Sequence, residues 1–195
     1  MNLRLRAIER HDSARLLQWR NSPEVAAYMY SDHRISEAEH ERWFAATLIA
    51  EDRRYWVVEL DDRPVGLVNL ARIDVLSRRC EWAYSLADPS TRGRGVGAQV
   101  EFIMLRHVFG PMGFNKLWCE VFKDNDAVWK LHESFGFKRE AEYREHVYKG
   151  GRFRDVIGLG MLRSDWEAAR PAVETRLRAK GLDPAALPEP PEVTP

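Results

Sequence analysis

Arg92-Gly93-Arg94-Gly95-Val96-Gly97 joins a predicted strand over residues 80–87 to a predicted helix that runs to about residue 109. Glycine lets a chain turn tightly and lets main-chain N–H groups approach a ligand with no Cβ in the way. The first N–H groups of the following helix have no partner inside it and carry the positive end of its dipole. The two arginines add charge, so the turn predicts a phosphate or pyrophosphate site. The alternative is a plain strand-to-helix turn with two solvated arginines.

Two other phosphate-binding folds fit this turn poorly. No Gly-Lys-Ser or Gly-Lys-Thr follows the glycines, so the lysine and the magnesium-binding hydroxyl of a P-loop are missing. The glycine spacing is G-x-G-x-G, and no regular βαβ pattern surrounds it, which argues against a dinucleotide-binding fold.

Around the turn, helices and strands follow one another without an internal repeat. Apolar alternation and turn residues predict strands over residues 3–7, 55–60, 65–73, 80–87, 116–122, 138–148 and 153–162. Helices are expected after the capping residues Asp12, Ser36 and Ser164, and over residues 96–109 and 126–134. Hairpin turns at residues 61–64 and at Gly150-Gly151 make the order mixed rather than a regular βαβ array.

Composition narrows the class of protein further. The chain has 195 residues, of which 45% are apolar, enough for one domain with a sizeable core. Lys+Arg 30 balances Asp+Glu 30, so no overall charge attracts nucleic acid or anionic lipid. The two cysteines fit neither a disulfide scaffold nor a zinc site, and no metal is expected. The N-terminus has no signal peptide and no apolar run could span a membrane, which predicts a soluble protein of a reducing compartment.

Two separated motifs, in this order, resemble the GNAT N-acetyltransferases. Arg92-x-x-Gly95-x-Gly97 after Asp88-Pro89 is similar to that family's acetyl-CoA pyrophosphate loop. Asn125 followed by residues 131–137 (LHESFGF) is similar to its Asn…Leu-Tyr-Glu-Lys-Leu-Gly-Phe segment. The resemblance covers most of residues 1–166 and implies an α/β (α+β) GNAT fold, with a mixed, mostly antiparallel sheet splayed at the cofactor site and flanked by helices. Residues 167–195 would form a helical extension and a proline-rich tail.

The resemblance also implies where acetyl-CoA binds. It would lie in a gap between the strand that ends at Ala87 and the strand that begins at Lys116. Main-chain groups near Leu86 and Ala87 would pair with the pantetheine and polarise the thioester carbonyl, and a preorganised N–H donor of this kind contributes a few kcal/mol. The residues expected to hold the cofactor are Leu86, Ala87, Arg92, Gly93, Arg94, Gly95, Val96, Gly97 and Asn125.

The N-terminal part resembles one branch of the family. Residues 19–25 (WRNSPEV) and 29–31 (MYS) are similar to a stretch of the nucleotide-sugar 4-amino N-acetyltransferase (PseH-type) of pseudaminic-acid biosynthesis. Arg20 and His40 would then bind the diphosphate of a UDP-amino-sugar, since arginine grips phosphate with two donors. Met29, Tyr30 and Tyr84 would pack on the uracil or the sugar. The alternatives are that Arg20 caps the first helix and that Met29 and Tyr30 belong to the core.

Acetyl transfer to an amine needs a base for the ammonium and a proton for the departing thiolate. Glu120 is the candidate base, because alternation along its strand turns it away from the face of Cys119 and Val121; Glu81 is a weaker alternative, and a solvated Glu120 is equally compatible. His132 stands where the family's tyrosine acid does. Its ordinary pKa near 6.5 suits proton transfer, although an inert packing role remains open.

The sequence therefore predicts an acetyl-CoA-dependent enzyme in which the amine attacks the thioester directly. The favoured acceptor is the 4-amino group of UDP-4-amino-4,6-dideoxy-N-acetyl-β-L-altrosamine, on the route to pseudaminic acid and flagellin glycosylation. The alternatives are a ribosomal-protein-type N-terminal acetyltransferase and a non-catalytic CoA-binding module. No nucleic-acid or membrane partner is expected; a cytoplasmic location is expected, and a homodimer is compatible with the resemblance.

Overall fold

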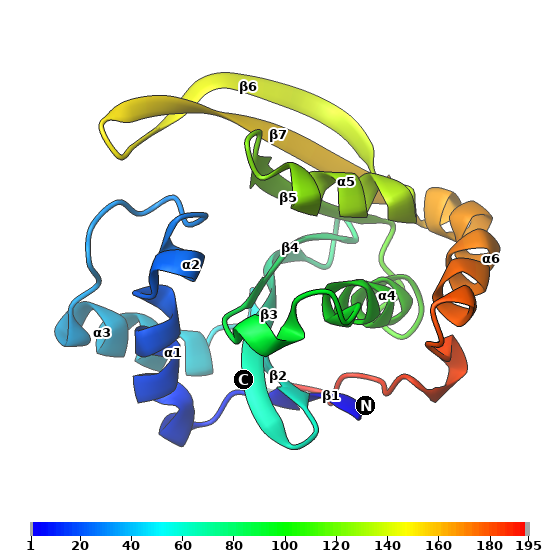
Figure 1. The fold of residues 1–195 in the computed structure, drawn as a ribbon, viewed down its shortest axis with the longest axis horizontal. Coiled ribbons are helices and arrows are strands. Elements are labelled where there is room, and N and C mark those ends of the chain that lie inside the picture. Colours follow the sequence, from blue (N-terminus) through cyan, green and yellow to red (C-terminus); the bar gives the residue numbers. More distant parts are fainter. Residues whose placement is uncertain (1, 194–195) are drawn as a thin grey trace.

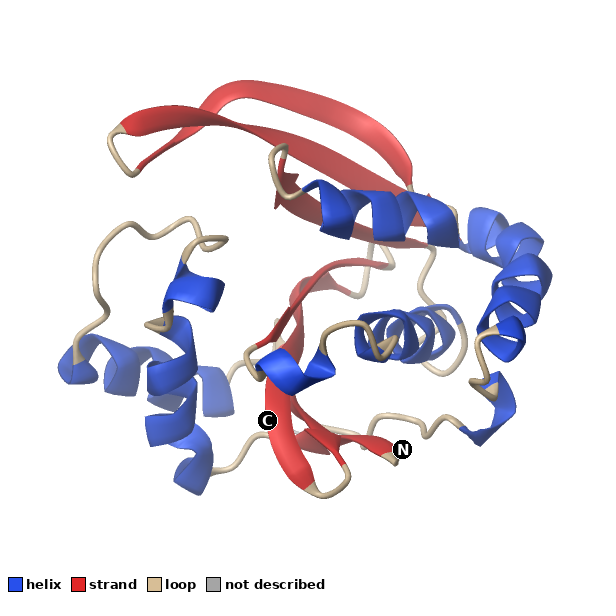
Figure 2. Cartoon of the chain, in the orientation of Figure 1, coloured by secondary structure: helices blue, strands red, loops and turns tan. Residues whose placement is uncertain are grey.

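A seven-stranded sheet carries the fold, in the order β1-β2-β3-β4-β5-β7-β6 (Figures 1 and 2). The computed structural model describes residues 2–193. The strands are β1 Leu3–Ala7, β2 Arg54–Leu60, β3 Arg63–Asp74, β4 Arg79–Leu86, β5 Lys116–Phe122, β6 Lys138–Lys149 and β7 Arg152–Leu162. Every neighbouring pair is antiparallel except β4 and β5, which are parallel. The mixed, mostly antiparallel sheet that the GNAT resemblance implied is thus confirmed.

Helices lie on both sides of the strands. They are α1 Ser13–Arg20, α2 Pro23–Ala26, α3 Glu37–Leu48, α4 Val96–Phe109, α5 Asp126–Phe135 and α6 Arg163–Ala179, with short 3-10 turns at Arg10–Asp12, Pro89–Thr91 and Pro184–Ala186. Figure 1 shows α1, α2 and α3 gathered on one side of the strands and α4 and α5 on the other. None of the helices in the described part of the chain is long and apolar enough to cross a bilayer.

The two halves of the sheet separate between β4 and β5. These strands pair only over Arg79↔Lys116, Cys80↔Leu117 and Glu81↔Trp118. Beyond that point β4 continues against β3 and β5 continues against β7, so the facing edges of β4 and β5 are unpaired. We call this opening the β4/β5 gap. It is the splay that the GNAT resemblance implied, and it leaves main-chain donors and acceptors free for a ligand.

The main core lies between the sheet and α4. This helix is buried along most of its length, and its apolar side chains, such as Val100, Ile103 and Leu105, are completely covered. A smaller cluster of Ile8, Leu16, Phe44 and Val57 fastens α1 and α3 to the opposite face. At about 25 cal/mol per Å² of buried apolar surface, clusters of this kind supply most of the driving force for folding.

Several element limits agree with the sequence predictions. The strand over residues 116–122 and the helix over residues 96–109 have the predicted bounds. Ser36 caps α3, since its Oγ accepts a hydrogen bond from the Glu39 N–H at 3.2 Å. Gly136 ends α5 with a φ of 108°, in the left-handed region.

Two predicted helix caps differ from the structure. Asp12 is the N-cap residue of α1, as predicted, but its carboxylate accepts two hydrogen bonds from the Arg6 guanidinium, at 2.8 and 2.9 Å, and makes no capping hydrogen bond to the helix. Ser164 lies inside α6, because Leu162 is the N-cap residue and its N–H donates to Asp165 at 3.2 Å. In both places a neighbouring charged side chain outcompetes the predicted cap.

The C-terminal tail is fastened to the body. The Arg106 guanidinium on α4 donates to the carbonyls of Leu187 and Pro188, each at 2.7 Å. The Trp56 indole N–H donates to the Pro191 carbonyl at 2.9 Å. The tail was predicted from its composition, whereas these contacts join residues far apart in sequence. Residues 194–195 of the predicted tail, and Met1 of the predicted domain, lie outside the described residues.

Candidate active site

The glycine-rich turn opens α4 with its main-chain donors free. Gly93 and Gly95 have φ values of 72° and 71°, in the left-handed region that favours glycine. Within residues 2–193, the N–H groups of Val96, Gly97 and Ala98 have no main-chain acceptor. These three donors at a helix N-terminus suit an anion.

Side chains around the turn fit a pyrophosphate. A Cβ at Gly97 would lie 3.1 Å from the Tyr84 hydroxyl oxygen, so a larger residue here would crowd Tyr84 at the start of α4. Arg92 is exposed and Arg94 lies 3.6 Å from Asp61 of the β2–β3 turn. The cradle therefore combines free N–H groups, missing side chains and positive charge, which is the combination that a phosphorylated ligand needs.

The main chain of β4 presents Leu86, not Ala87, to the gap. The Ala87 N–H donates to the Val65 carbonyl on the β3 side at 2.9 Å. Because main-chain groups alternate in direction along a strand, those of Tyr84 and Leu86 point to the β4/β5 gap. Of the two residues predicted to polarise a thioester, the structure leaves Leu86 available.

Asn125 is the N-cap residue of α5. Its carbonyl accepts a hydrogen bond from the Val128 N–H at 3.2 Å, which starts the helix. Its half-buried carboxamide makes no hydrogen bond to another described residue. The amide is thus free to hold an extended ligand that enters the gap from the glycine-rich turn.

On the α4 side of the gap, His132 of α5 is buried against charged and aromatic groups. Its Nδ1 lies 3.0 Å from Oε1 of Glu101, and its ring centroid is 5.1 Å from Trp82 and 6.3 Å from Tyr84. Burial alone lowers the pKa of His132, but the Glu101 carboxylate and the Cys119 thiol beside the ring raise it to about 10. The raised pKa favours the protonated imidazole at neutral pH.

Tyr84 belongs to this α4 side. The sequence predicts that Tyr84 contacts the acceptor, but its ring stacks on Trp82 at 5.5 Å and its hydroxyl lies next to Gly97 of the glycine-rich turn. Burial, followed by the nearby charge of Glu101, raises the pKa of Tyr84. The residue sits with the predicted cofactor residues rather than with the predicted substrate residues.

On the opposite side of the gap, Glu120 accepts a hydrogen bond from the Tyr30 hydroxyl at 2.7 Å. The Tyr30 ring lies 5.3 Å from Phe122, and burial and then Glu120 raise the pKa of this phenol. Glu81 shares the face; burial and then the charge of Glu120 raise its pKa, against the opposing effect of Arg72. Two carboxylates and a phenol thus border the gap on the side of α1–α3.

The other residues predicted for the acceptor are placed differently. The Arg20 guanidinium lies 4.4 Å above the Trp43 ring, and burial lowers its pKa. His40 is 1% exposed, with its ring 5.3 Å from Trp43, so it offers no surface to a diphosphate. Met29 is half-buried in the turn after α2.

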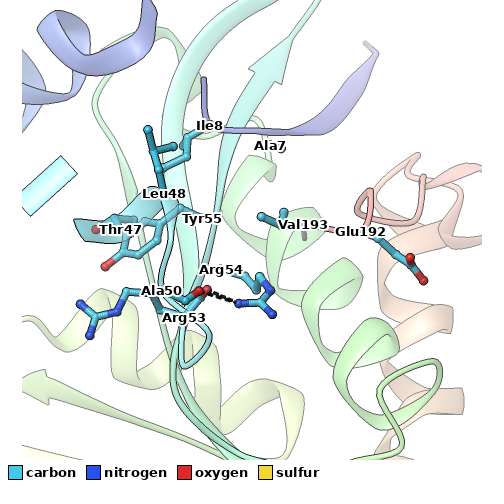
Figure 3. Close-up of a pocket in the computed structure, with 10 residues that line it drawn as sticks. All are labelled: Ala7, Ile8, Thr47, Leu48, Ala50, Arg53, Arg54, Tyr55, Glu192 and Val193. Atoms are coloured by element: carbon cyan, nitrogen blue, oxygen red, sulfur yellow. Dashed lines mark hydrogen bonds between the residues drawn. The ribbon is translucent and has the colours of Figure 1, made fainter. Parts of the chain in front are cut away.

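Figure 3 shows a separate cavity of about 180 Å³. It lies where α3 ends and β2 begins, and Thr47, Tyr55 and Val193 line part of it. None of the residues predicted to bind cofactor or acceptor contributes to its wall. Among residues 2–193, no three His, Cys, Asp or Glu side chains are grouped so that they could hold a metal ion.

Glu101 is the site residue that sequence reasoning missed. Its side chain is completely buried within α4. The signal was present, because a carboxylate in the apolar stretch over residues 100–105 (VEFIML) demands a buried partner.

An anion cradle that leads into an unpaired strand edge suits a transferase whose donor is a long phosphorylated thioester. Comparisons with known proteins also indicate an acetyltransferase. A family model described as acetyltransferase (GNAT) domain matches residues 2–138. The chain belongs to the GNAT acetyltransferase family, and it is an enzyme that transfers acetyl from acetyl-CoA to an amine.

Curated relatives and solved structures share most of the chain. It is 25% identical over 158 residues to a spermidine N(1)-acetyltransferase of Escherichia coli K12, which is 81% of this chain and 84% of that protein. It is 28% identical over 167 residues to an uncharacterized prophage N-acetyltransferase of Bacillus subtilis, covering 85% and 93%. The crystal structure of the Vibrio cholerae spermidine N-acetyltransferase with CoA and spermine superposes with a TM-score of 0.79, at 26% identity, over 85% of this chain and 98% of that one. The two relatives with a stated substrate are spermidine N-acetyltransferases, so the predicted closeness to the pseudaminic-acid branch is not supported.

Proposed function

We propose that this enzyme acetylates a primary amine of a small cationic acceptor, of the aliphatic polyamine kind. The observation that carries the proposal is the pair of carboxylates, Glu81 and Glu120, on the acceptor side of the β4/β5 gap. Within residues 2–193, Glu120 forms no ion pair with a lysine, arginine or histidine, so its charge is available to an ammonium group. The likeness to two spermidine N-acetyltransferases supports the same class of acceptor.

Each predicted residue has a separate role in this proposal. When bound, acetyl-CoA supplies the acetyl group as a thioester. Arg92, the glycines and the first N–H groups of α4 hold its pyrophosphate, and the Asn125 carboxamide holds its pantetheine arm. The Leu86 N–H donates to the oxygen on which negative charge develops, and an oriented donor of this kind contributes about 3–4 kcal/mol.

Proton transfer is divided between the two sides of the gap. Glu120 takes the proton of the acceptor ammonium, directly or through water, with Tyr30 fixing the orientation of its carboxylate. His132, on the other side, delivers a proton to the departing thiolate. The two groups lie on opposite faces of the sheet, which keeps the imidazolium from neutralising the base.

A second candidate is the nucleotide-sugar acceptor predicted from the sequence. One observation favours it: among the described residues, the Arg20 guanidinium has no carboxylate partner and its Nη1 is buried without a hydrogen bond. Such a group suits a phosphate. Against it, His40 is buried between aromatic rings, and Glu120, which has no ion-pair partner among the described residues, would repel a diphosphate, whereas Glu81 is paired with Arg72 at 3.3 Å.

The test is acetyl-CoA-dependent release of CoA with three kinds of acceptor: spermidine and spermine, the UDP-4-amino sugar, and a panel of N-terminal peptides. Turnover with polyamines alone supports the proposal, and turnover with the sugar alone replaces it with the second candidate. Turnover with peptides alone gives an N-terminal acetyltransferase, and acetyl-CoA binding without any turnover gives a non-catalytic module. Reactions without enzyme serve as the control for spontaneous acetylation.

The proposal includes a homodimer, a cytoplasmic location and an extension that begins at residue 167. The extension is supported by the tail contacts of Arg106 and Trp56. Sedimentation of the purified protein measures the oligomeric state directly, and a monomer would remove the homodimer from the proposal.

A further inference from the structure

Glu101 and His132 form a closed pair under the β4/β5 gap. Glu101 is 0% exposed and His132 is 3% exposed, and Oε1 of the carboxylate lies 3.0 Å from Nδ1 of the ring. The second carboxylate oxygen, Oε2, is buried and has no hydrogen-bond partner among the described residues. The pair connects the middle of α4 to the last turn of α5.

A buried carboxylate with one partner is unstable unless that partner is charged. Removing two charges from water is expensive, and a buried anion left without compensation destabilises a fold by several kcal/mol. Within residues 2–193 no arginine or lysine is paired with Glu101, so His132 is the one described partner that can supply a compensating positive charge. The imidazolium form protonates both ring nitrogens, which leaves Nε2–H as the second donor.

The surroundings of the ring place that second donor next to the strand edges. Three titratable groups face His132: Glu101 from α4, Cys119 from β5 and Tyr84 from β4. Tyr84 and Cys119 belong to the two strands that border the gap, and Trp82 and Phe137 close the remaining sides of the ring. The only full opposite charge in this group is the Glu101 carboxylate.

We propose that Glu101 is a positioning residue that holds His132 as an imidazolium beside the β4/β5 gap, so that the enzyme keeps a charged acid ready at neutral and alkaline pH. The inference rests on the proposed role of His132 as the acid. It explains how that role is possible above neutral pH. A histidine without a charged partner loses its proton near pH 6.5, and at a still lower pH when it is buried. Glu101 thereby makes histidine usable where the family resemblance implied tyrosine.

The direct test is NMR titration of the imidazole nitrogens in the full-length protein between pH 6 and 10. In the wild type we expect His132 to remain doubly protonated at pH 8.5. In Glu101→Gln it should titrate at or below pH 6.5, a shift of at least two pH units. Neutral His132 in the wild type at pH 7, or an unchanged titration in Glu101→Gln, would overturn the proposal.

Matched variants distinguish a specific effect of Glu101 on His132 from the general effect of removing a buried polar group. Glu59→Gln removes another buried carboxylate, held by Arg4 and Arg6 on β1, and should leave the His132 titration unchanged. Cys119→Ala removes the neighbouring thiol and should leave His132 charged at pH 8.5. If Glu101→Gln does not fold, Glu101→Asp keeps the charge, and His132 should then still be charged at pH 7.

Kinetics then distinguish failure of this proposal from failure of the acid role. Glu101→Gln should lower kcat at pH 8.5 by about tenfold or more, with the KM for acetyl-CoA changed less than about twofold. In a His132→Phe background, Glu101→Gln should cause no further loss of kcat. If the titration is as expected but His132→Phe has wild-type kcat, the pair exists and the acid role is wrong.

Discussion

Replacing Gly95 with alanine tests whether the glycine-rich turn binds the cofactor, and the same replacement at Gly93 is the control. Gly95 and Gly93 have nearly equal φ values of 71° and 72°. An alanine forced into this left-handed region costs about 1–2 kcal/mol, so both variants should lose that much stability. A Cβ at Gly95 would also lie 3.1 Å from Cδ1 of Leu182, whereas a Cβ at Gly93 meets nothing within 4 Å.

The contact with Leu182 adds little, because a terminal methyl can rotate aside for about 0.5–1 kcal/mol. Gly95→Ala should therefore lose about 1.5–3 kcal/mol in total and Gly93→Ala about 1–2 kcal/mol. For a chain of this size each kcal/mol lowers Tm by about 2–4 °C. Thermal unfolding of the two variants and of Gly95→Ala combined with Leu182→Ala measures the difference.

The functional difference should be larger than the difference in stability. Gly95 immediately precedes the free N–H groups of α4, so relief of its strain turns those donors away from the ligand. Loss of one hydrogen bond to a charged group costs about 1.5–3 kcal/mol, which raises the KM for acetyl-CoA about 10- to 100-fold. Gly93→Ala should raise that KM by about twofold at most. A Gly95→Ala enzyme that melts earlier but keeps its KM would refute the assignment of the turn to the pyrophosphate.

Four further outcomes are expected. Glu120→Gln should lower kcat/KM about 10²-fold at pH 7.5 with little change in Tm, and wild-type turnover would exclude Glu120 as the base. Arg20→Ala should leave the spermidine KM within about twofold while losing about 1 kcal/mol of stability with its Trp43 contact; a selective loss toward the UDP-sugar would favour the second candidate instead. Arg106→Ala should free the tail and speed tryptic cleavage after Arg178, and an unchanged cleavage rate would contradict the role of its carbonyl contacts. The contribution of His132 to stability should be complete below pH 6.5 and be lost as the pH rises toward 10, because the pKa of His132 is raised in the folded state; urea unfolding at pH 6.5 and 9.5 measures the slope, which Glu101→Gln should flatten.

Local pattern was sufficient for much of the fold. Alternation along β5 correctly put Glu120 on the face opposite Cys119, because side chains of a strand alternate whatever surrounds it. The same rule, applied between Glu81 and Tyr84, would have shown that these two residues face opposite sides of β4. The aromatic character of Tyr84 does not indicate which face of β4 it occupies, whereas its position in the strand puts it on the face of Trp82 and Gly97.

Contacts between distant segments could not be predicted in this way. Arg20 and Trp43 meet because α1 packs on α3, and the separation between them in sequence carries no signal of that packing. The anchoring of the tail by Arg106 and Trp56 likewise depends on where the chain returns after α6. The β4/β5 gap followed from the family resemblance and not from the pattern of either strand.

In the proposed mechanism, the charges on the two sides of the gap allow one site to serve both proton transfers. A base for the acceptor must be an anion, and an acid for the thiolate must carry a proton, so the two groups would cancel if they touched. Here the sheet separates them. On one face Glu120 accepts a hydrogen bond from the neutral Tyr30, and on the other face His132 is hydrogen-bonded to the Glu101 carboxylate. In the proposed mechanism Glu101 keeps His132 protonated above neutral pH, so we expect the fall in rate at low pH to follow protonation of the acceptor amine and of Glu120 rather than of His132. That division is suited to a strongly basic aliphatic amine, whose ammonium needs the carboxylates at the gap both to bind and to lose its proton.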